Sequence, residues 1–377
     1  DDDLSRGLGD VYKRQENALY FKRITIIRIN FFFSINFIQF CHQLFFMNDI
    51  KELLSVKSKI LITTHVNPDG DAIGSSLALY NFLIKLGHEV SVVVPNDYPD
   101  YLKWMKSDDK ILNFSDRSDE IELLIKDIQI IFCLDFNNLS RINELGKLIE
   151  ESSAKKILID HHLNPDNFYD FKYHNVDASA TAELVYDLII FMDEDLIDKD
   201  ISDCIYTGIL TDTGSFRFSS TTSKVHRIIA KLLDQGVRPE QIGKIIYESN
   251  SFDKLKLLGY SLSEKLKIIC GGKAAYIALT RKDLLDYNYR KGDTEGIVNY
   301  ALSISGVNMA ALIIETKDRI KFSFRSSGNF SVNKFANNYF NGGGHKNAAG
   351  GSIEDKLSVA LDKFLESISK HKEELNY

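Results

Sequence analysis

Histidine and aspartate residues gather in four short segments between His65 and Asp212. The segments are His65-Val-Asn-Pro-Asp69-Gly-Asp71, the lone Asp135, Asp160-His161-His162, and Asp212 within Thr-Asp-Thr-Gly. If these side chains shared one pocket, their like charges would repel strongly in the absence of cations. Asp and His ligands without thiolates suit Mn²⁺, Mg²⁺, Fe²⁺ or Zn²⁺. The residue types therefore predict a site for divalent metal ions.

Each segment by itself also has an ordinary structural explanation. Asp69-Gly-Asp71 fits a turn, Asp135 fits the start of a loop, Asp160-His161-His162 fits a solvated strand end, and Asp212 fits a helix N-cap. An EF-hand is excluded, because Ile73 and Tyr80 stand where that loop needs carboxylates. Four independent coincidences are less economical than one shared site, so the joint pattern favours the metal site.

The elements around these segments predict an α/β fold with a mostly parallel sheet. Short apolar runs typical of buried strands cover residues 59–64, 89–95, 127–136 and 155–162, and helical periods cover residues 72–87 and 178–192. Helices alternating with such strands indicate a sheet with helices on both faces. Because ligands of open α/β sheets bind beyond the carboxyl ends of the strands, we expect the segments to converge there.

The sequence changes character after a helical connector predicted over residues 237–263. Strand-like runs at residues 268–280, 307–316 and 319–327 precede a glycine-rich run, which predicts a smaller C-terminal α+β domain over residues 264–377. Residues 47–263 are net acidic, whereas residues 264–377 are net basic. This division suits cations in the first domain and phosphates in the second.

The second domain contains candidate phosphate contacts. The run Gly342-Gly343-Gly344-His345 would let backbone N–H groups approach an anion closely. Arg325, followed by Ser326, is the corresponding candidate on a strand. The alternatives are a plain flexible loop for the glycines and a surface charge on an edge strand for Arg325.

Composition excludes several classes of protein. With 377 residues, 44% hydrophobic residues, 22 Gly and 5 Pro, the chain is neither collagenous nor wholly disordered. A net charge of −7 argues against a histone-like, wholly basic binder. The four cysteines are scattered without a Cys-x-x-Cys pair, so we expect a reducing, cytoplasmic location. No Walker or dinucleotide-binding glycine pattern is present, so such cofactors are unsupported.

The first 46 residues do not fit the regular pattern that follows. Residues 24–46 are rich in Ile and Phe but interrupted by polar residues, and the first methionine is Met47. A spanning helix needs about 20 predominantly apolar residues, and no signal-peptide cleavage pattern is visible. We therefore interpret residues 1–46 as a non-native or disordered extension, with a membrane anchor as the alternative.

The four segments, taken in order, resemble the DHH phosphoesterase superfamily. The literal Asp-His-His at residues 160–162 carries the resemblance together with the spacing of His65, Asp69 and Asp71. The glycine run ending in His345 resembles the signature of the family's DHH-associated C-terminal domain. The resemblance implies a catalytic domain over residues 47–236, and the short two-domain arrangement is similar to the oligoribonuclease and 3′-phosphoadenosine-5′-phosphate phosphatase group, the nanoRNases.

The resemblance implies two metal ions per chain, with Mn²⁺ expected and Mg²⁺ or another divalent ion as an alternative. His65, Asp69 and Asp135 would hold one ion, and Asp71, Asp135, His161 and Asp212 would hold the other. Asp160 would lie behind the direct metal ligands as part of the catalytic site, and His162 would face the phosphate. Arg325, Ser326, Gly342, Gly343, Gly344 and His345 would bind substrate. Two ions bridged by a carboxylate would activate a water molecule for attack on phosphorus.

The expected function is hydrolysis of short oligoribonucleotides, such as pApA, to mononucleotides. A further expected substrate is 3′-phosphoadenosine-5′-phosphate, which would yield AMP. The partners would be short RNA and nucleotides, no membrane association is expected, and a homodimer is compatible with the sequence. The alternatives are a nucleotide-binding regulatory module without turnover and an inorganic pyrophosphatase-like hydrolase.

Overall fold

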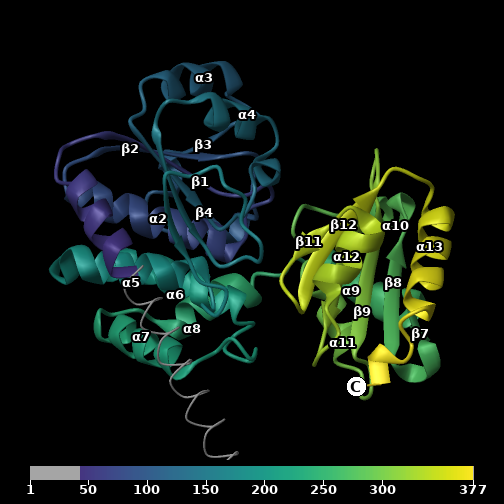
Figure 1. The fold of residues 1–377 in the computed structure, drawn as a ribbon. Helices are drawn as coiled ribbons and strands as arrows, with labels where there is room; N and C mark the ends of the chain where they lie inside the picture. The colour runs from purple at the N-terminus through teal and green to yellow at the C-terminus, as the bar shows by residue number, and fades with distance from the viewer. Residues whose placement is uncertain (1–42, 377) are drawn as a thin grey trace, which may run out of the picture.

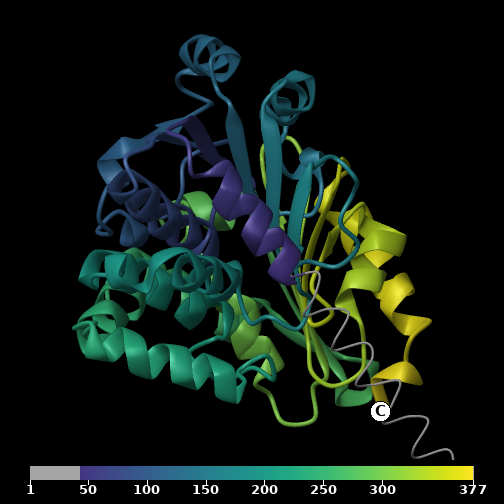
Figure 2. The ribbon, with the colours of Figure 1, turned by 60° about the vertical axis from the view of Figure 1, so that its left-hand side comes forward.

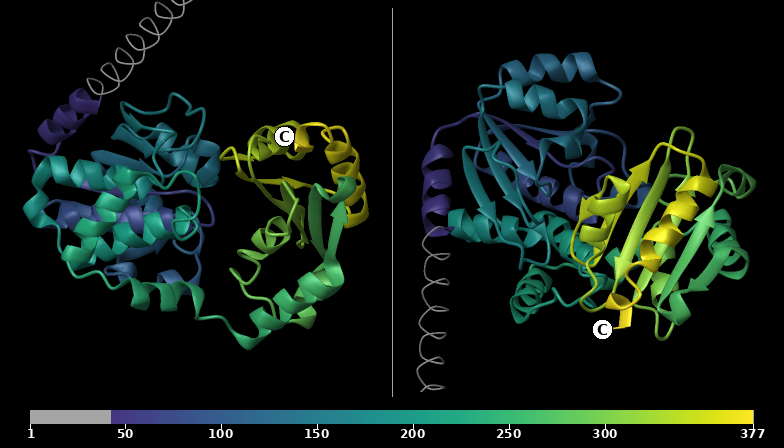
Figure 3. Two further views of the ribbon diagram at one scale, coloured as in Figure 1. Left: turned by 90° about the horizontal axis from the view of Figure 1, so that it is seen from below. Right: turned by 45° about the vertical axis from the view of Figure 1, so that its right-hand side comes forward.

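The computed structural model describes residues 43–376, which form two domains joined by a helical connector (Figures 1 and 3). The first domain is drawn in purple to teal, and the second lies beside it in green to yellow. Each domain is built around its own six-stranded sheet. The predicted division into an N-terminal α/β domain and a smaller C-terminal domain agrees with this arrangement.

The sheet of the first domain is entirely parallel and has the order β3-β2-β1-β4-β5-β6. Its strands are β1 (Lys59–Thr63), β2 (Glu89–Val94), β3 (Ile111–Asn113), β4 (Ile130–Leu134), β5 (Lys155–Asp160) and β6 (Phe171–His174). The four strands predicted from apolar runs are present. The two outer strands, β3 and β6, were not predicted. They are short edge strands whose residues are mostly only partly buried, so they lack a continuous apolar run.

Helices cover both faces of this sheet, as predicted. The helices α2 (Gly70–Lys85), α5 (Thr181–Asp193) and α6 (Lys199–Asp212) pack on one face, and α3 (Ser118–Lys126) and α4 (Glu144–Glu151) pack on the other (Figure 1). The strand alternation explains the two cores. Ile60 and Ile62 of β1 point into one core, while Leu61 points into the other.

A helix over residues 43–53 runs through the boundary expected at Met47 (purple in Figure 2). Phe46 is buried and stacks on Tyr173 with a ring-centroid distance of 5.4 Å, and Gln43 donates a hydrogen bond to the Tyr173 hydroxyl. The domain therefore begins before Met47, while residues 1–42 of the proposed extension lie outside the described residues. Within residues 43–376, no helix combines the length and apolar character of a membrane span.

The connector consists of short helices, as expected for residues 237–263. The helices α7 (Ser223–Asp234) and α8 (Pro239–Tyr247) pack on the core of the first domain, and α9 (Phe252–Tyr260) packs on the core of the second. Residues 248–251 between α8 and α9 are the covalent link at which the two domains separate in Figure 3.

The second sheet is mixed, with the order β11-β12-β10-β9-β8-β7. Its strands are β7 (Leu266–Ile269), β8 (Ala274–Leu279), β9 (Met309–Glu315), β10 (Ile320–Ser326), β11 (Gly343–Gly344) and β12 (Ala348–Ile353). The helices α12 (Val332–Phe340) and α13 (Leu357–Ser369) pack on one face, and α9, α10 (Arg281–Asp286) and α11 (Ile297–Leu302) pack on the other. The run predicted as one strand at residues 268–280 is a hairpin, because Gly271 and Gly272 turn the chain with φ of 64° and 88°.

Candidate metal centre and its substrate side

The carboxyl ends of β1, β4 and β5 lie side by side, because these strands are neighbours in the sheet. His65 follows β1, Asp135 follows β4 directly, and Asp160 is the last residue of β5. The chain runs from β1 outward to β3 and then places β4 on the other side of β1. A crevice at such a reversal of strand order is the usual ligand site of an open parallel sheet.

Two helices bring Asp71 and Asp212 to the same place. Asp71 lies in the first turn of α2, and Asp212 is the last residue of α6. These helices touch closely at glycines: a Cβ atom on Gly70 would lie 2.4 Å from the Thr211 hydroxyl, and one on Gly208 would lie 3.0 Å from Oδ1 of Asp71. The absence of side chains at these positions allows the two carboxylates to meet.

The first group of candidate ligands consists of His65, Asp69 and Asp135. Nε2 of His65 lies 3.4 Å from Oδ2 of Asp135 and 3.9 Å from Oδ1 of Asp69. Nδ1 of His65 donates to the backbone carbonyl of Val66 at 2.9 Å, so Nε2 is the ring nitrogen that faces the carboxylates. Such an outer hydrogen bond is the usual means of orienting a metal-ligating histidine.

The second group consists of Asp71, His161 and Asp212. Nε2 of His161 lies 3.4 Å from Oδ2 of Asp212 and 3.7 Å from Oδ2 of Asp71. Nδ1 of His161 donates to the backbone carbonyl of Ala178 at 3.1 Å, so this imidazole is oriented in the same way as His65.

Asp135 lies between the two groups and shares its two oxygens between them. Oδ2 faces His65, whereas Oδ1 lies 3.4 Å from Nε2 of His161 and accepts a hydrogen bond of 2.9 Å from the Thr181 hydroxyl. Its φ of 64° is in the left-handed region, which turns the chain sharply after β4 and aims the carboxylate into the crevice. Among the residues at the strand ends, Asp135 is thus the one whose carboxylate faces both groups of candidate ligands.

The spacing of the donor atoms fits divalent ions. Two ligands that each lie about 2.1 Å from one ion are separated by about 3.0–3.4 Å, depending on the coordination angle. The His–Asp distances of 3.4–3.9 Å are close to this range. The donors are imidazole nitrogens and carboxylate oxygens, without thiolate, which suits Mn²⁺, Mg²⁺ or Zn²⁺.

The electrostatics of the cluster also favour bound positive charge. Burial, together with repulsion from Asp135 and Asp212, raises the pKa of Asp71 well above its usual range. Burial raises the pKa of Asp212 to about 7 against the opposing charge of His161. Burial acts on Asp135 in the same direction, but hydrogen bonding to His161 and His65 holds the pKa of Asp135 well below its usual range. Carboxylates this crowded remain ionised together only when cations accompany them.

A third group of Asp160, His162 and His345 lies beside the metal ligands. Nδ1 of His162 donates to Oδ1 of Asp160 at 2.7 Å, and Asp160 is fully buried. His345 comes from the second domain, and its ring centroid lies 4.3 Å from that of His162 and 4.6 Å from that of His161. Burial, followed by repulsion from His162 and His161, lowers the pKa of His345 well below its usual value. The two domains therefore meet at the cluster of candidate metal ligands.

The other predicted substrate residues differ in their placement. Arg325 of β10 lies close enough to Asp212 and Asp69 for their charges to act on its guanidinium group. Ser326 does not reach the site: its buried hydroxyl donates to the carbonyl of Phe330 at 2.7 Å and accepts from Asn347. Arg325 and Ser326 are adjacent in a strand, so their side chains leave opposite faces of the sheet.

The glycine run is a short strand rather than a flexible loop. Gly343 and Gly344 form β11, paired with β12, and the backbone N–H of Gly342 already donates to the carbonyl of Ala336. A Cβ atom at Gly342 would lie 2.0 Å from the carbonyl oxygen of Gly350, whereas one at Gly343 would meet open space. Gly342 therefore serves packing, and its N–H is not available to an anion.

Sequence reasoning missed the contribution of the α5 N-terminus. The backbone N–H groups of Thr181 and Ala182 donate to the two oxygens of Asp71 at 2.6 and 2.8 Å. A helix N-terminus attracts anions because its first N–H groups have no partner within the helix. The helical period from residue 178 indicated where this helix starts, but not that it faces Asp71.

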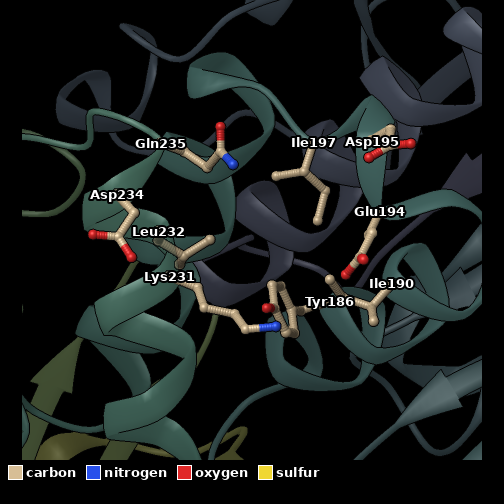
Figure 4. Close-up of a pocket in the computed structure, with 9 residues that line it drawn as sticks. All are labelled: Tyr186, Ile190, Glu194, Asp195, Ile197, Lys231, Leu232, Asp234 and Gln235. Atoms are coloured by element: carbon tan, nitrogen blue, oxygen red, sulfur yellow. The ribbon is translucent and has the colours of Figure 1, made fainter.

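A surface pocket of about 410 Å³ lies away from these residues (Figure 4). It is formed by the C-terminal part of α5, the segment after it and α7, with Tyr186, Lys231 and Asp234 in its lining. The metal candidates lie at the opposite, N-terminal end of α5. This pocket contains none of the candidate ligands.

Comparisons with known proteins agree with the two-domain arrangement. Residues 59–209 match the model of the DHH family, N-terminal domain, and residues 271–373 match that of the DHHA1 domain. The chain is 32% identical over 318 residues to the bifunctional oligoribonuclease and PAP phosphatase NrnA of Thermus thermophilus, covering 84% of this chain and 91% of that protein. The protein of the same name from Bacillus subtilis is 28% identical over 308 residues, covering 80% and 91%.

A solved structure has the same fold over nearly the whole described chain. It is an exopolyphosphatase-related protein from Bacteroides fragilis, which is 39% identical and superposes with a TM-score of 0.84, covering 88% of this chain and 98% of that one. The first family match includes the Asp-His-His segment, and the second includes the glycine run. The chain belongs to the DHH family and combines its N-terminal domain with a DHHA1 domain.

Proposed function

We propose that this chain is a two-metal phosphoesterase that hydrolyses short oligoribonucleotides to mononucleotides and 3′-phosphoadenosine-5′-phosphate to AMP. Membership of the DHH family makes the chain a hydrolase. The substrate classes follow the relatives in Thermus thermophilus and Bacillus subtilis, which are named oligoribonuclease and PAP phosphatase. The proposed metal is Mn²⁺, with two ions per chain.

The observation that carries the proposal is the position of Asp135 between two oriented imidazoles. One carboxylate oxygen faces His65 and the other faces His161, each at 3.4 Å from Nε2. A carboxylate that serves two ligand groups is characteristic of paired-metal phosphoester sites. A site built only to bind a nucleotide has no need of this arrangement, which argues against the regulatory-module alternative.

In this proposal, the bound ions would supply a water molecule of lowered pKa and neutralise charge on the phosphoryl oxygens. His65, Asp69 and Asp135 would hold one ion, and Asp71, Asp135, His161 and Asp212 the other. Thr181 would keep the Asp135 carboxylate from rotating, because its hydroxyl donates to Oδ1. The backbone N–H groups at the start of α5 would do the same for Asp71.

His162 would contact the phosphoryl group. Its Nδ1–H is occupied by Asp160 at 2.7 Å, so Nε2 is the atom that remains for substrate. The buried Asp160 carboxylate also fixes the orientation of this imidazole, so that Nε2 would form a hydrogen bond to a phosphoryl or leaving-group oxygen. His345 and Arg325 would bind the substrate from the second domain, where positive charge exceeds negative charge.

The test combines turnover with metal content. The purified chain is assayed on pApA, longer RNA, 3′-phosphoadenosine-5′-phosphate and pyrophosphate, with Mn²⁺ and with chelator. We expect metal-dependent release of mononucleotide from pApA and of phosphate from 3′-phosphoadenosine-5′-phosphate, and little hydrolysis of pyrophosphate. Rapid pyrophosphate hydrolysis would favour the pyrophosphatase alternative, and tight nucleotide binding without turnover would favour the regulatory module.

Substitution of Asp135 tests the bridging role directly. Asp135→Asn should lower turnover by more than about 100-fold and reduce the metal content from two ions per chain, as measured by elemental analysis. Asp119→Asn is a matched control, because Asp119 is exposed on α3 and belongs to none of the candidate metal groups. Activity of Asp135→Asn above a few per cent of wild type, with two ions retained, would refute bridging by this carboxylate.

A further inference from the structure

Two hydrogen bonds join the domains at a distance from the covalent link, within the part of the chain that the structure describes. The Tyr101 hydroxyl, in a short helical turn at Asp100–Leu102 of the first domain, donates to the carboxylate of Glu295 in the second. Nζ of Lys291 donates to the backbone carbonyl of Asp97. Both bonds connect the segment 96–103 to the loop 288–296.

The main chains of these two segments also approach each other. A Cβ atom placed on Gly292 would lie 3.6 Å from Cβ of Pro99, which is ordinary van der Waals contact. Gly292 has a φ of 96°, a conformation that residues with side chains rarely adopt. The loop 288–296 thus also packs against the first domain at Gly292, beside Pro99.

This contact is close to the candidate site. The charges of Asp69 and Arg325 both act on Glu295, so the Tyr101–Glu295 bond lies near a metal-ligand candidate and a substrate candidate. His345, from the same domain as Glu295, lies over His162 and His161. The loop contact and the His345 contact therefore hold the second domain against the first at two places.

We propose that the segments 96–103 and 288–296 form an interdomain latch, which opens to admit a nucleotide and closes to hold His345 and Arg325 over the metal cluster. Tyr101 is the positioning residue of this latch. It acts through the second domain and not on the reacting atoms. The proposal goes beyond the phosphoesterase function, although its kinetic readout rests on that function.

The ring of Tyr101 anchors this side chain in the first domain, and its hydroxyl binds the second domain. Its ring is half-buried and packs against the core of the first domain, so the ring stays with that domain. Its hydroxyl alone reaches the second domain. A single partly exposed hydrogen bond changes an open–closed equilibrium by about fivefold, which is enough to change affinity without unfolding either domain.

Tyr101→Phe isolates the hydroxyl, because the ring that packs against the core is retained. The matched control is Tyr173→Phe. The Tyr173 hydroxyl also donates to a carboxylate, that of Asp187 at 2.8 Å, but both residues belong to the first domain and lie outside the segments 96–103 and 288–296. Small-angle X-ray scattering of the full chain measures closure without reference to any substrate, and kinetics on pApA measure its consequence.

We expect Tyr101→Phe to have a larger radius of gyration than wild type and to raise KM for pApA by about fivefold, with kcat little changed, because only the population of the closed state falls. Tyr173→Phe should match wild type in both measurements. Equal radii for all three proteins would overturn the latch, whether or not pApA is a substrate. Failure of wild type to cleave pApA would contradict the proposed function and leave the scattering test of the latch in force.

A disulfide across the latch provides a second test. The 3.6 Å between the Pro99 Cβ and a Cβ on Gly292 lies within the range for cysteine pairs. In the double variant Pro99→Cys/Gly292→Cys, oxidation should hold the two domains together and lower turnover of pApA by at least about tenfold, and a reductant should restore it. Unchanged turnover after complete cross-linking would show that this edge need not open and would overturn the proposal.

Discussion

A methyl group added at Gly208 should damage the metal site more than the fold. Gly208 lies one helical turn before Asp212 on α6, so both residues occupy the same face. A Cβ atom at Gly208 would lie 2.6 Å from the Ala182 Cβ and 3.0 Å from Oδ1 of Asp71. In Gly208→Ala, the new methyl group must therefore displace α6 from α5 and from the Asp71 carboxylate.

Two opposing terms set the effect on stability. Alanine favours a helix over glycine by about 1 kcal/mol, whereas overpacking of a buried position costs about 1–3 kcal/mol. The free energy of unfolding should consequently fall by at most about 2 kcal/mol. The catalytic effect should be larger, because a displacement of about 1 Å in a catalytic group can cost about 100-fold in rate.

The chain offers a matched control for this substitution. Gly243 lies in α8, and a Cβ atom there would have no neighbour within 4 Å. Gly243→Ala should therefore gain the helical preference of about 1 kcal/mol without steric cost. Chemical denaturation, kcat/KM for pApA and metal titration would be measured on both variants.

A compensating substitution tests the steric explanation. Ala182→Gly removes the atom that lies 2.6 Å from the new methyl group, so the double variant Gly208→Ala/Ala182→Gly should recover part of the lost activity. The reasoning would be refuted if Gly208→Ala bound metal and turned over pApA as well as Gly243→Ala, because α6 would then absorb the methyl group without moving Asp212.

Three further outcomes follow from individual contacts. Arg325→Ala should raise KM for pApA more than it lowers kcat, with a loss in kcat/KM of about 10- to 150-fold, and should hardly change cleavage of bis-p-nitrophenyl phosphate. His65→Ala should impair cleavage of both substrates. Equal losses on the two substrates in Arg325→Ala would place Arg325 at the reaction centre. Phe46→Ala, which removes the buried ring stacked on Tyr173, should lower the free energy of unfolding by about 3 kcal/mol in urea denaturation, and an unchanged value would show that the helix over residues 43–53 does not support the domain. Although burial opposes it, hydrogen bonding to Lys265 and to the Thr280 cap lowers the pKa of Asp283 to about 2. This carboxylate therefore stabilises the fold above its unfolded pKa near 4, and the stabilisation is lost as the pH falls towards 2. Asp283→Asn should thus be less stable than wild type by about 2 kcal/mol at pH 7 and nearly as stable as wild type near pH 2, and a difference in unfolding free energy that does not depend on pH would contradict the ionic contribution.

Local patterns in the sequence were sufficient for most of the first domain and for the composition of the site. The apolar runs of β1, β4 and β5 are continuous because these central strands are buried on both faces, and the residues after them belong to one edge of the sheet. The edge strands β3 and β6 carry no such run and were missed. The expected start at Met47 was also wrong for the fold, because Phe46 is buried against a ring that lies far along the chain.

The tertiary structure decided the details that depend on contacts between distant segments. The resemblance in sequence assigned Ser326 and Gly342 to substrate binding. In the structure, strand alternation turns the Ser326 side chain away from the site, and the N–H of Gly342 already donates to the carbonyl of Ala336. The hydrogen bond between Tyr101 and Glu295 joins residues 194 positions apart in two different domains. The hydrophobic periodicity of each segment carries no information about how the two domains are placed relative to each other. Periodicity determines which face of an element is buried, whereas the packing of one element against another determines which atoms finally meet.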